Sequence, residues 1–382
     1  MKKIPVVNGL RGFAICSVVF HHLFFGAFLY GKQETTLLMQ TFQSVLSSGW
    51  LGVNLFFILS GLVLYWPYAR GDRAFSQRGE IRDFYKRRFI RLLPLYWFIC
   101  VVSLVFATDI PVSDPSFHRW FAALATVVFP FSVGSFVPRP NWVLWSLGVE
   151  IIFSVVFPGV VLVLQRFGWR KVMVGGLVLS FAARLVGQIF FCGAPNGYLL
   201  NAVSDSLLGR FDEFLLGMLL AHLIATPSNC GVFSGARAVA GGLAVLFAMC
   251  AWGAWLRLEI PGWSGALISW PLNAGLFFII GRLVSAPGPS RLRQLFELWP
   301  LQMLGLMCYS IYLWHGIVMV RLSVAGKGIA EHFTYLVIVI ILSWFTYRYI
   351  EFGRERDIRK LMPQRRDALS SCDQPDRVMP GA

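Results

Sequence analysis

Long runs of apolar residues recur along almost the whole chain and determine the expected architecture. A helix needs about 18 or more predominantly apolar residues to cross the hydrocarbon core of a bilayer. The stretches that fit lie at residues 10–30, 50–68, 91–108, 143–164, 172–191, 206–224, 236–256, 264–283, 302–322 and 333–350. The pattern therefore predicts an all-α polytopic membrane protein with about ten transmembrane helices.

The distribution of charge predicts how these helices are oriented. The 382 residues carry 34 Lys+Arg against 19 Asp+Glu, a net charge of +15, yet only 14% of them are charged, against about 25% in soluble domains. The cations gather in the loop at 69–91, just after residue 165, and after residue 347. Because short cytoplasmic loops are rich in Lys and Arg, we place these segments and both termini in the cytoplasm, and we expect no nucleic-acid partner.

Two segments do not fit the ten-span pattern. The apolar patch at 120–136 is short and contains Pro130 and Gly134, and making it a span would break the charge asymmetry of every downstream loop. We expect it to be a re-entrant or interfacial segment near the outer mouth. Residues 363–382 are polar and rich in proline, so we expect a disordered cytoplasmic tail after a single membrane domain at 1–362.

The seven cysteines argue against both a disulfide framework and a metal site. Their number is odd, no Cys-x-x-Cys pair occurs, and most of them lie inside apolar runs. Cysteines in such positions usually behave as small core residues. We therefore predict no metal centre.

Arg11 and His22 form the first candidate site. They are eleven residues apart, so a helix places them within about 20° of one face and about 16 Å apart along its axis, whereas His21 points roughly 80° away. Charged residues within spans usually face a cavity and mark function. Taken alone, Arg11 could equally be an anchor at the inner boundary and His22 a hydrogen-bonding partner between helices.

Glu150 and His315 are two further candidates that lie inside other expected spans. Glu150 lies one or two turns inside the span at 143–164, and His315 lies near the middle of the span at 302–322, at the depth expected for His22. Convergence of two histidines and a glutamate is more than packing requires. The alternatives are an ion pair between Glu150 and a neighbouring arginine, and a hydrogen-bonded core position for His315.

Arg88 and Arg91 are three positions apart at the start of a span. On a helix they share one face and could hold a phosphate group. Anchoring by positive charge at the inner surface would explain the neighbouring Lys86 and Arg87 equally well.

Charges of both signs also stand at the start of the span at 206–224. Asp205, Arg210, Asp212 and Glu213 could neutralise one another, for example through Arg210 with Asp205 or Asp212. We expect an ion-pair cluster at the outer mouth, in which one of the acids could also contact a polar substrate.

Six short motifs carry these residues and occur in a recognisable order. They are Leu10-Arg11-Gly12-Phe13-Ala14 leading to His22, Gly52-Val53-Asn54-Leu55-Phe56-Phe57-Ile58-Leu59-Ser60-Gly61, Arg88-x-x-Arg91-Leu-Leu-Pro-Leu-Tyr-Trp, Trp145-Ser146-Leu147-x-Val149-Glu150, Phe211-Asp212-x-Phe214-Leu215-x-Gly217 and Tyr309-Ser310-x-Tyr312-Leu313-x-His315. The chain thereby resembles the acyltransferase-3 family of bacterial integral-membrane O-acyltransferases. It departs from the family at Asn54, where an Asp is common, and at Ile151, where a second acid is common.

The resemblance implies a multi-pass enzyme of the bacterial inner membrane with ten spans and both termini inside. It implies transfer of an acyl group, commonly acetyl from acetyl-CoA, to a hydroxyl of a glycan or glycolipid such as a cell-surface polysaccharide or lipopolysaccharide. Acyl-CoA would then be a co-substrate, with no tightly bound cofactor. Arg11 and His22 would be essential, and Arg88 and Arg91 would bind the coenzyme A end.

Our mechanistic hypothesis makes His22 the general base for the acceptor hydroxyl. Glu150 and His315 would orient His22 or bind the acceptor, and a covalent acyl-enzyme through Ser60 or His22 is an open alternative. Further oxyanion or substrate contacts are expected from Ser60, Asn54, Tyr309, Tyr312 and Asp212. The partners would be acyl-CoA, a glycan or lipid-linked glycan, and membrane lipid; the acyl group, the acceptor and the oligomeric state stay open.

A transporter or flippase for a polar glycan or lipid is the alternative function. Such a protein also needs charged residues that face an intramembrane cavity. The absence of an evident inverted repeat and the arginine-rich loop at 69–91 count against it. A purely structural membrane scaffold would give no reason for His22, Glu150 and His315 to converge.

Overall fold

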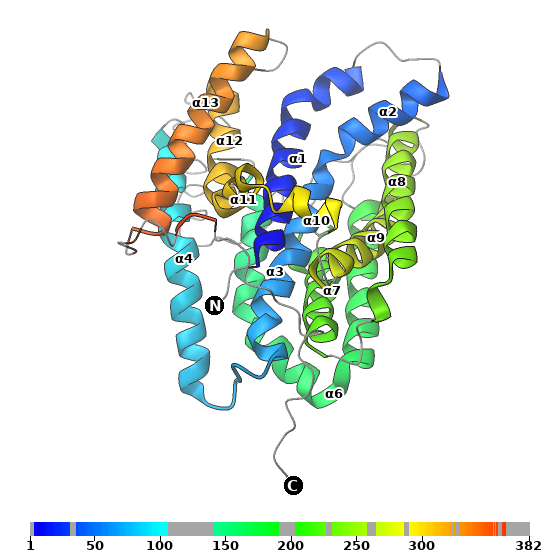
Figure 1. Ribbon diagram of the computed structural model, residues 1–382, viewed down its shortest axis with the longest axis vertical. Coiled ribbons are helices and arrows are strands. Elements are labelled where there is room, and N and C mark those ends of the chain that lie inside the picture. The colour runs from blue at the N-terminus through cyan, green and yellow to red at the C-terminus, as the bar shows by residue number, and fades with distance from the viewer. Residues whose placement is uncertain are drawn as a thin grey trace.

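The computed structural model confirms the all-α class within the residues it describes. These are residues 4–30, 36–105, 141, 143–190, 203–226, 231–257, 265–285, 290–322, 324, 328–353, 355, 357 and 361–363. Every regular element among them is helical (Figure 1). The segment expected at 120–136 and the tail expected after Pro363 lie outside the described residues.

The helices follow the apolar runs in order. They are α1 (Pro5–Tyr30), α2 (Leu37–Ser47), the 3₁₀ turn η1 (Ser48–Trp50), α3 (Leu51–Ala69), α4 (Arg78–Val105), α6 (Leu144–Phe190), α7 (Leu207–Ala225), α8 (Gly235–Arg257), α9 (Gly265–Ser285), α10 (Arg291–Phe296), α11 (Trp299–Leu306), α12 (Cys308–Leu322), α13 (Ile329–Thr346) and the π-helical turn η5 (Tyr347–Glu351). In the described part of the chain six helical segments are long and apolar enough to cross a membrane, or seven if α11 and α12 form one broken span. The chain is therefore a multi-pass membrane protein, while ten spans and cytoplasmic termini stay predictions.

Two elements differ from the expected spans. The spans expected at 143–164 and 172–191 belong to one 47-residue element, α6, which kinks at Gly168. Gly168 has φ 77°, a conformation that glycine adopts without steric cost. The prediction of one continuous helix at 302–322 is wrong, because α11 and α12 meet at an angle of 74° around Met307.

Glycines bring the central helices close together. A Cβ atom at Gly12 of α1 would collide with the Leu301 carbonyl oxygen of α11, and one at Gly217 of α7 would collide with the Ile58 carbonyl oxygen of α3. Backbones approach this closely only where the residue has no side chain, which is typical of helix pairs in membranes. The motif glycines therefore fix α1 and α3 against their neighbours.

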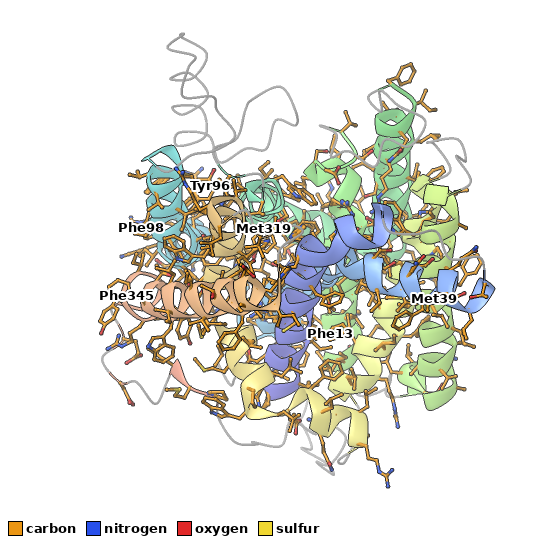
Figure 2. All side chains as sticks on the ribbon, turned by 90° about the horizontal axis from the view of Figure 1, so that it is seen from above. Phe13, Met39, Tyr96, Phe98, Met319 and Phe345 are labelled. Carbon is orange, nitrogen blue, oxygen red and sulfur yellow. The ribbon has the colours of Figure 1, made fainter. Side chains whose placement is uncertain are left out.

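The two central helices lie between two outer groups. Figure 1 shows α4, α12 and α13 on one side of α1 and α3, and α7, α8 and α9 on the other. In the most apolar stretch of α8 only 11% of the residues are buried, and in that of α13 only 22%. Figure 2 shows exposed Phe98 and Phe345 at one edge of the molecule and exposed Met39 at the opposite edge. Surfaces of this kind suit contact with lipid.

Candidate active site

A partly open cavity lies between α1, α3, α4, α6 and α12. It encloses about 690 Å³ of empty space, and we call it the central cavity. Its lining residues are Arg11, Val53, Phe56, Phe57, Ser60, Arg88, Arg91, Leu92, Ser146, Leu147, Glu150, Cys308, Tyr309 and Tyr312. Seven of the candidates proposed from the sequence are therefore brought together from five helices.

An ion pair lies on the wall of the central cavity. Arg88 donates from Nη2 to Glu150 Oε1, and its Nε donates to Ser154 Oγ at 2.8 Å. Ser60 Oγ donates to the same Glu150 oxygen at 3.0 Å. The Glu150 side chain is 27% exposed. Glu150 thus holds Arg88 in the cavity, as the alternative of an ion pair anticipated.

The other two cations of the cavity are less fully paired. Among the described residues no hydrogen bond or ion pair joins the Arg11 guanidinium to a protein group, although Arg11 lines the cavity. Arg91 Nε lies 3.9 Å from Glu351 Oε1, and the Arg91 side chain is 42% exposed. Three arginines and one glutamate give the cavity lining an excess of positive charge. Such a cavity attracts anions.

Arg88 and Arg91 do not act as a symmetric pair in this structure. Arg88 points to Glu150, whereas Arg91 faces Glu351 and packs over the ring of Phe352 at 5.9 Å. Glu351 is buried on the π-helical turn η5, and Ser310 Oγ donates to its Oε2 at 3.4 Å. Of the two arginines, Arg91 is therefore the one available to a ligand that enters from solvent.

His22 and His315 form a direct pair. His22 Nδ1 lies 3.0 Å from His315 Nε2, and the two rings are nearly parallel, with an interplanar angle of 12° and centroids 5.1 Å apart. His315 is fully buried, and its Nδ1 lies 2.6 Å from the carbonyl oxygen of Tyr312. His21 turns away, with its Nδ1 at 2.7 Å from the Ser47 carbonyl oxygen. The sequence prediction that His22 and His315 lie at one depth is confirmed, and Glu150 lies elsewhere, with Arg88.

Tyr312 contacts both the central cavity and the histidine pair. Its ring lines the cavity and lies 5.3 Å from the ring of His315, centroid to centroid. Its hydroxyl and that of Ser146 are 2.6 Å apart. Tyr309 lines the same wall and donates its hydroxyl to the Leu92 carbonyl oxygen at 2.6 Å. Three residues of helix rise about 4.5 Å, so His315 lies one turn beyond Tyr312 along α12.

A second polar group is buried on the other side of α3, and here the structure places Asn54 and Asp212. We call it the Glu213 network; its members are Asn54, Arg184, Asp205, Arg210, Asp212, Glu213, Ser269 and Asn273. Arg184 reaches Asp212 Oδ1 at 2.5 Å and Glu213 Oε1 at 3.2 Å. Neither Asn54 nor Asp212 lines the central cavity.

The ion pairs of the Glu213 network match the expected cluster only in part. Arg210 pairs with Asp205 at 2.7 Å, as proposed, and with Glu213 at 3.2 Å instead of Asp212. Asn54 donates to Glu213 Oε1 at 2.8 Å and to Asn273 Oδ1 at 3.1 Å. Asn54 therefore contributes to helix packing between α3, α7 and α9, and an amide serves this purpose without adding another negative charge.

Sequence reasoning missed Arg184, Asn273, Ser154 and Glu351. Arg184 lies in the middle of the span expected at 172–191, so the rule that applied to Arg11 could have found it. Glu351 follows the last span directly and could have been found as its inner boundary. Nothing in the sequence distinguishes Ser154 from other small polar residues in spans.

Comparisons with known proteins find relatives over most of the chain. A family model described as an acyltransferase domain matches residues 4–348. O-acetyltransferase OatA of Staphylococcus aureus is 26% identical, across 92% of this chain and 57% of its own length. Peptidoglycan O-acetyltransferase OatA of Listeria monocytogenes is 23% identical, across 92% and 55%.

A third relative covers less of the chain. Acyltransferase MdmB of Streptomyces mycarofaciens is 26% identical across 63% of this chain and 62% of its own length. The chain thus spans a little over half of the length of these curated relatives. No solved structure matches it significantly.

Proposed function

Because the chain belongs to the acyltransferase domain family, as its resemblance to acyltransferase-3 enzymes indicated, we propose that it is a membrane O-acyltransferase. It moves an acyl group from acyl-CoA to a hydroxyl of a glycan or lipid-linked glycan. The observation that carries this proposal is the cationic central cavity next to the His22–His315 pair. The names of the two OatA relatives favour an acetyl group and a cell-surface polysaccharide.

The donor binds in the central cavity, with its phosphates at the cytoplasmic end. Arg91 is exposed and is held by Glu351 only at 3.9 Å, so it makes the contact with phosphate. Arg88 is bound to Glu150 and forms the wall past which the pantetheine arm extends. Arg11 also lines the cavity, and its guanidinium, which has no partner among the described residues, suits the thioester carbonyl.

The reaction joins the cavity to the histidine pair. His22 removes the proton from the acceptor hydroxyl as the oxygen attacks the thioester carbonyl carbon. The tetrahedral oxyanion is stabilised by Arg11 and by the hydroxyl of Tyr312, whereas the Ser60 hydroxyl is already donated to Glu150. The carbon–sulfur bond then breaks, the thiolate takes the proton back from His22, and CoA and the acyl ester leave.

Acceptor-dependent release of CoA tests this function. The full-length protein is reconstituted in liposomes with radiolabelled acetyl-CoA and a panel of peptidoglycan fragments, polysaccharides and lipid-linked oligosaccharides. We expect label in one acceptor and an equal amount of free CoA thiol. His22→Gln should lower the rate by about 10²–10⁴-fold, the contribution that is typical of a general base. A folded His22→Gln variant with normal activity would contradict the role of His22.

The same assay separates the enzyme from a transporter. Passage of a lipid-linked glycan across the liposome membrane without release of CoA would support the flippase alternative. Comparing glycan masses from cells with and without the gene identifies the acyl group and the acceptor together, since each ester adds the mass of one acyl group.

A native thiol reports donor binding without relying on catalysis. Cys308 is a free cysteine that lines the central cavity. Acetyl-CoA should slow the labelling of Cys308 by a membrane-permeant maleimide. Quantifying each labelled peptide by mass spectrometry gives the readout, and Cys308→Ser serves as the blank. Equal labelling of Cys308 with and without acetyl-CoA would place the donor outside this cavity.

A further inference from the structure

The hydrogen bonds around His315 determine where the protons of the histidine pair lie. A backbone carbonyl oxygen only accepts hydrogen bonds. His315 Nδ1 lies 2.6 Å from the Tyr312 carbonyl oxygen, so this nitrogen carries a proton. In a neutral imidazole the other nitrogen is then an acceptor. His315 Nε2 therefore offers a lone pair to its neighbour.

That neighbour is His22 Nδ1, at 3.0 Å. Two ring nitrogens at this distance need one proton between them, and His315 Nε2 already acts as the acceptor. His22 Nδ1 is therefore the donor. Because a neutral imidazole has only one N–H, the lone pair of His22 lies on Nε2. The tautomer of His22 is therefore determined by the Tyr312 carbonyl oxygen, which acts through His315.

We propose that His315 is a positioning residue, which holds His22 in the Nδ1–H tautomer and so makes Nε2 its basic nitrogen. This inference rests on the proposed function, in which His22 takes the proton of the acceptor hydroxyl. Proton uptake at Nε2 produces an imidazolium whose Nδ1–H bond to His315 is already formed. No rearrangement of the pair is then needed between proton uptake and return of that proton to the thiolate.

The surroundings hold His315 in this role. The side chain is fully buried, and the ring is anchored one turn back on its own helix. Tyr335 of α13 donates its hydroxyl to the His315 carbonyl oxygen at 3.3 Å, which ties α12 to α13 at this level. On the other side, His21 is bound to Ser47 and does not replace His315 as the partner of His22 Nδ1.

Nitrogen chemical shifts test the tautomer directly. The full-length protein is labelled with ¹⁵N-histidine and placed in nanodiscs at a pH where histidines are neutral, and the His22 signals are assigned by their loss in His22→Gln. We expect a protonated Nδ1 and an unprotonated Nε2 for His22. An Nε2–H tautomer would overturn the proposal. This readout needs no acceptor, so it stands even if acyl transfer is never detected.

Two substitutions of His315 separate positioning from packing. In His315→Gln the side-chain oxygen can take the place of Nε2 and accept from His22 Nδ1–H, whereas His315→Leu fills space without an acceptor. We expect Leu to lower acyl transfer by about 100-fold, the lower end of a general-base contribution, and to lose the Nδ1–H signature. Gln should recover a large part of both losses.

The controls make every outcome informative. His332→Leu makes the same chemical change at a half-buried histidine near the start of α13, whose Nδ1 lies 2.7 Å from the Gly328 carbonyl oxygen, and should keep both the rate and the His22 spectrum. Equal activity of the Gln and Leu variants at position 315 would mean that His315 only fills space. If both variants fail to fold, the wild-type spectrum alone decides the tautomer.

Discussion

The central cavity and the Glu213 network both place several charges inside the helical bundle, yet they differ in how far these charges are satisfied. In the network Asp212 and Glu213 are buried and shared between two arginines. In the cavity Arg11 has no protein partner among the described residues, and Arg91 is held only at 3.9 Å. Every charged side chain of the network has a partner of opposite sign, and the network has one more acid than arginines, whereas the cavity lining has two more arginines than acids.

This difference indicates which intramembrane charges belong to structure and which belong to chemistry. A buried charge is tolerated when paired partners and hydrogen bonds compensate for its lost hydration. A charged side chain without a protein partner on a cavity wall costs stability. It is retained where a ligand will supply the missing partner. Removing a charge should therefore damage folding in the network and ligand handling in the cavity.

The largest expected effect is on folding, from Arg184→Ala. The change leaves Asp212 and Glu213 without their shared cation, and breaking a buried pair in this way costs about 3–5 kcal/mol. We expect a much lower thermal midpoint and little folded protein, measured by size-exclusion chromatography after stepwise heating. Arg170→Ala, at an exposed position of the same helix, should change neither. A normal midpoint for Arg184→Ala would contradict the assignment of the network charges to folding.

An intermediate effect is expected from Glu150→Gln in the cavity. The amide oxygen can still accept from Ser60 and Arg88, and Glu150 is partly exposed, so stability should change by less than about 1 kcal/mol. Acyl transfer should fall by about tenfold or more, because Arg88 is no longer neutralised and fixed by a carboxylate. Thermal midpoints and initial rates on the same preparations check this. Loss of stability without loss of rate would move Glu150 into the structural class.

The smallest effects are expected at the mouth of the cavity, and they should have opposite signs. Arg91→Ala should raise the KM for acyl-CoA by about tenfold, since it removes one charge-assisted contact. Glu351→Gln should lower this KM by a few-fold, because Arg91 loses the carboxylate that competes with the phosphate. Steady-state kinetics over a range of acyl-CoA concentrations separates KM from kcat. Shifts in the same direction would show that the pair only stabilises η5.

Much of this contrast could be read from the sequence, because a charge in an apolar run is visible without coordinates. The helix period placed Arg11 and His22 on one face and turned His21 away, as the structure shows. Which residues pair with these charged side chains could not be predicted, since the pairing depends on how α6 and α7 are oriented about their axes relative to neighbouring helices. Glu150 was expected with either the histidines or an arginine, and only packing decided for Arg88.

For the helices, too, some features could be predicted from the sequence and others could not. Length and hydropathy found the helices, but hydropathy is averaged over a window and does not detect a break such as that at Met307. The kink at Gly168 needs a backbone conformation that a glycine permits but does not dictate. Arg184 carries the same sequence signal as Arg11, a charge inside an apolar run, but it lies outside the six motifs.

The close approach of α1 to α11 affects how substitutions in this protein are interpreted. Gly12 has no functional group, yet any side chain there would push α1 away from the backbone of α11. Arg11 and His22 belong to the same helix, α1, so both would move with it. Intolerance to substitution along α1 is therefore a record of geometry as well as of chemistry, and an inactive Gly12 variant is no evidence that residue 12 meets the substrate.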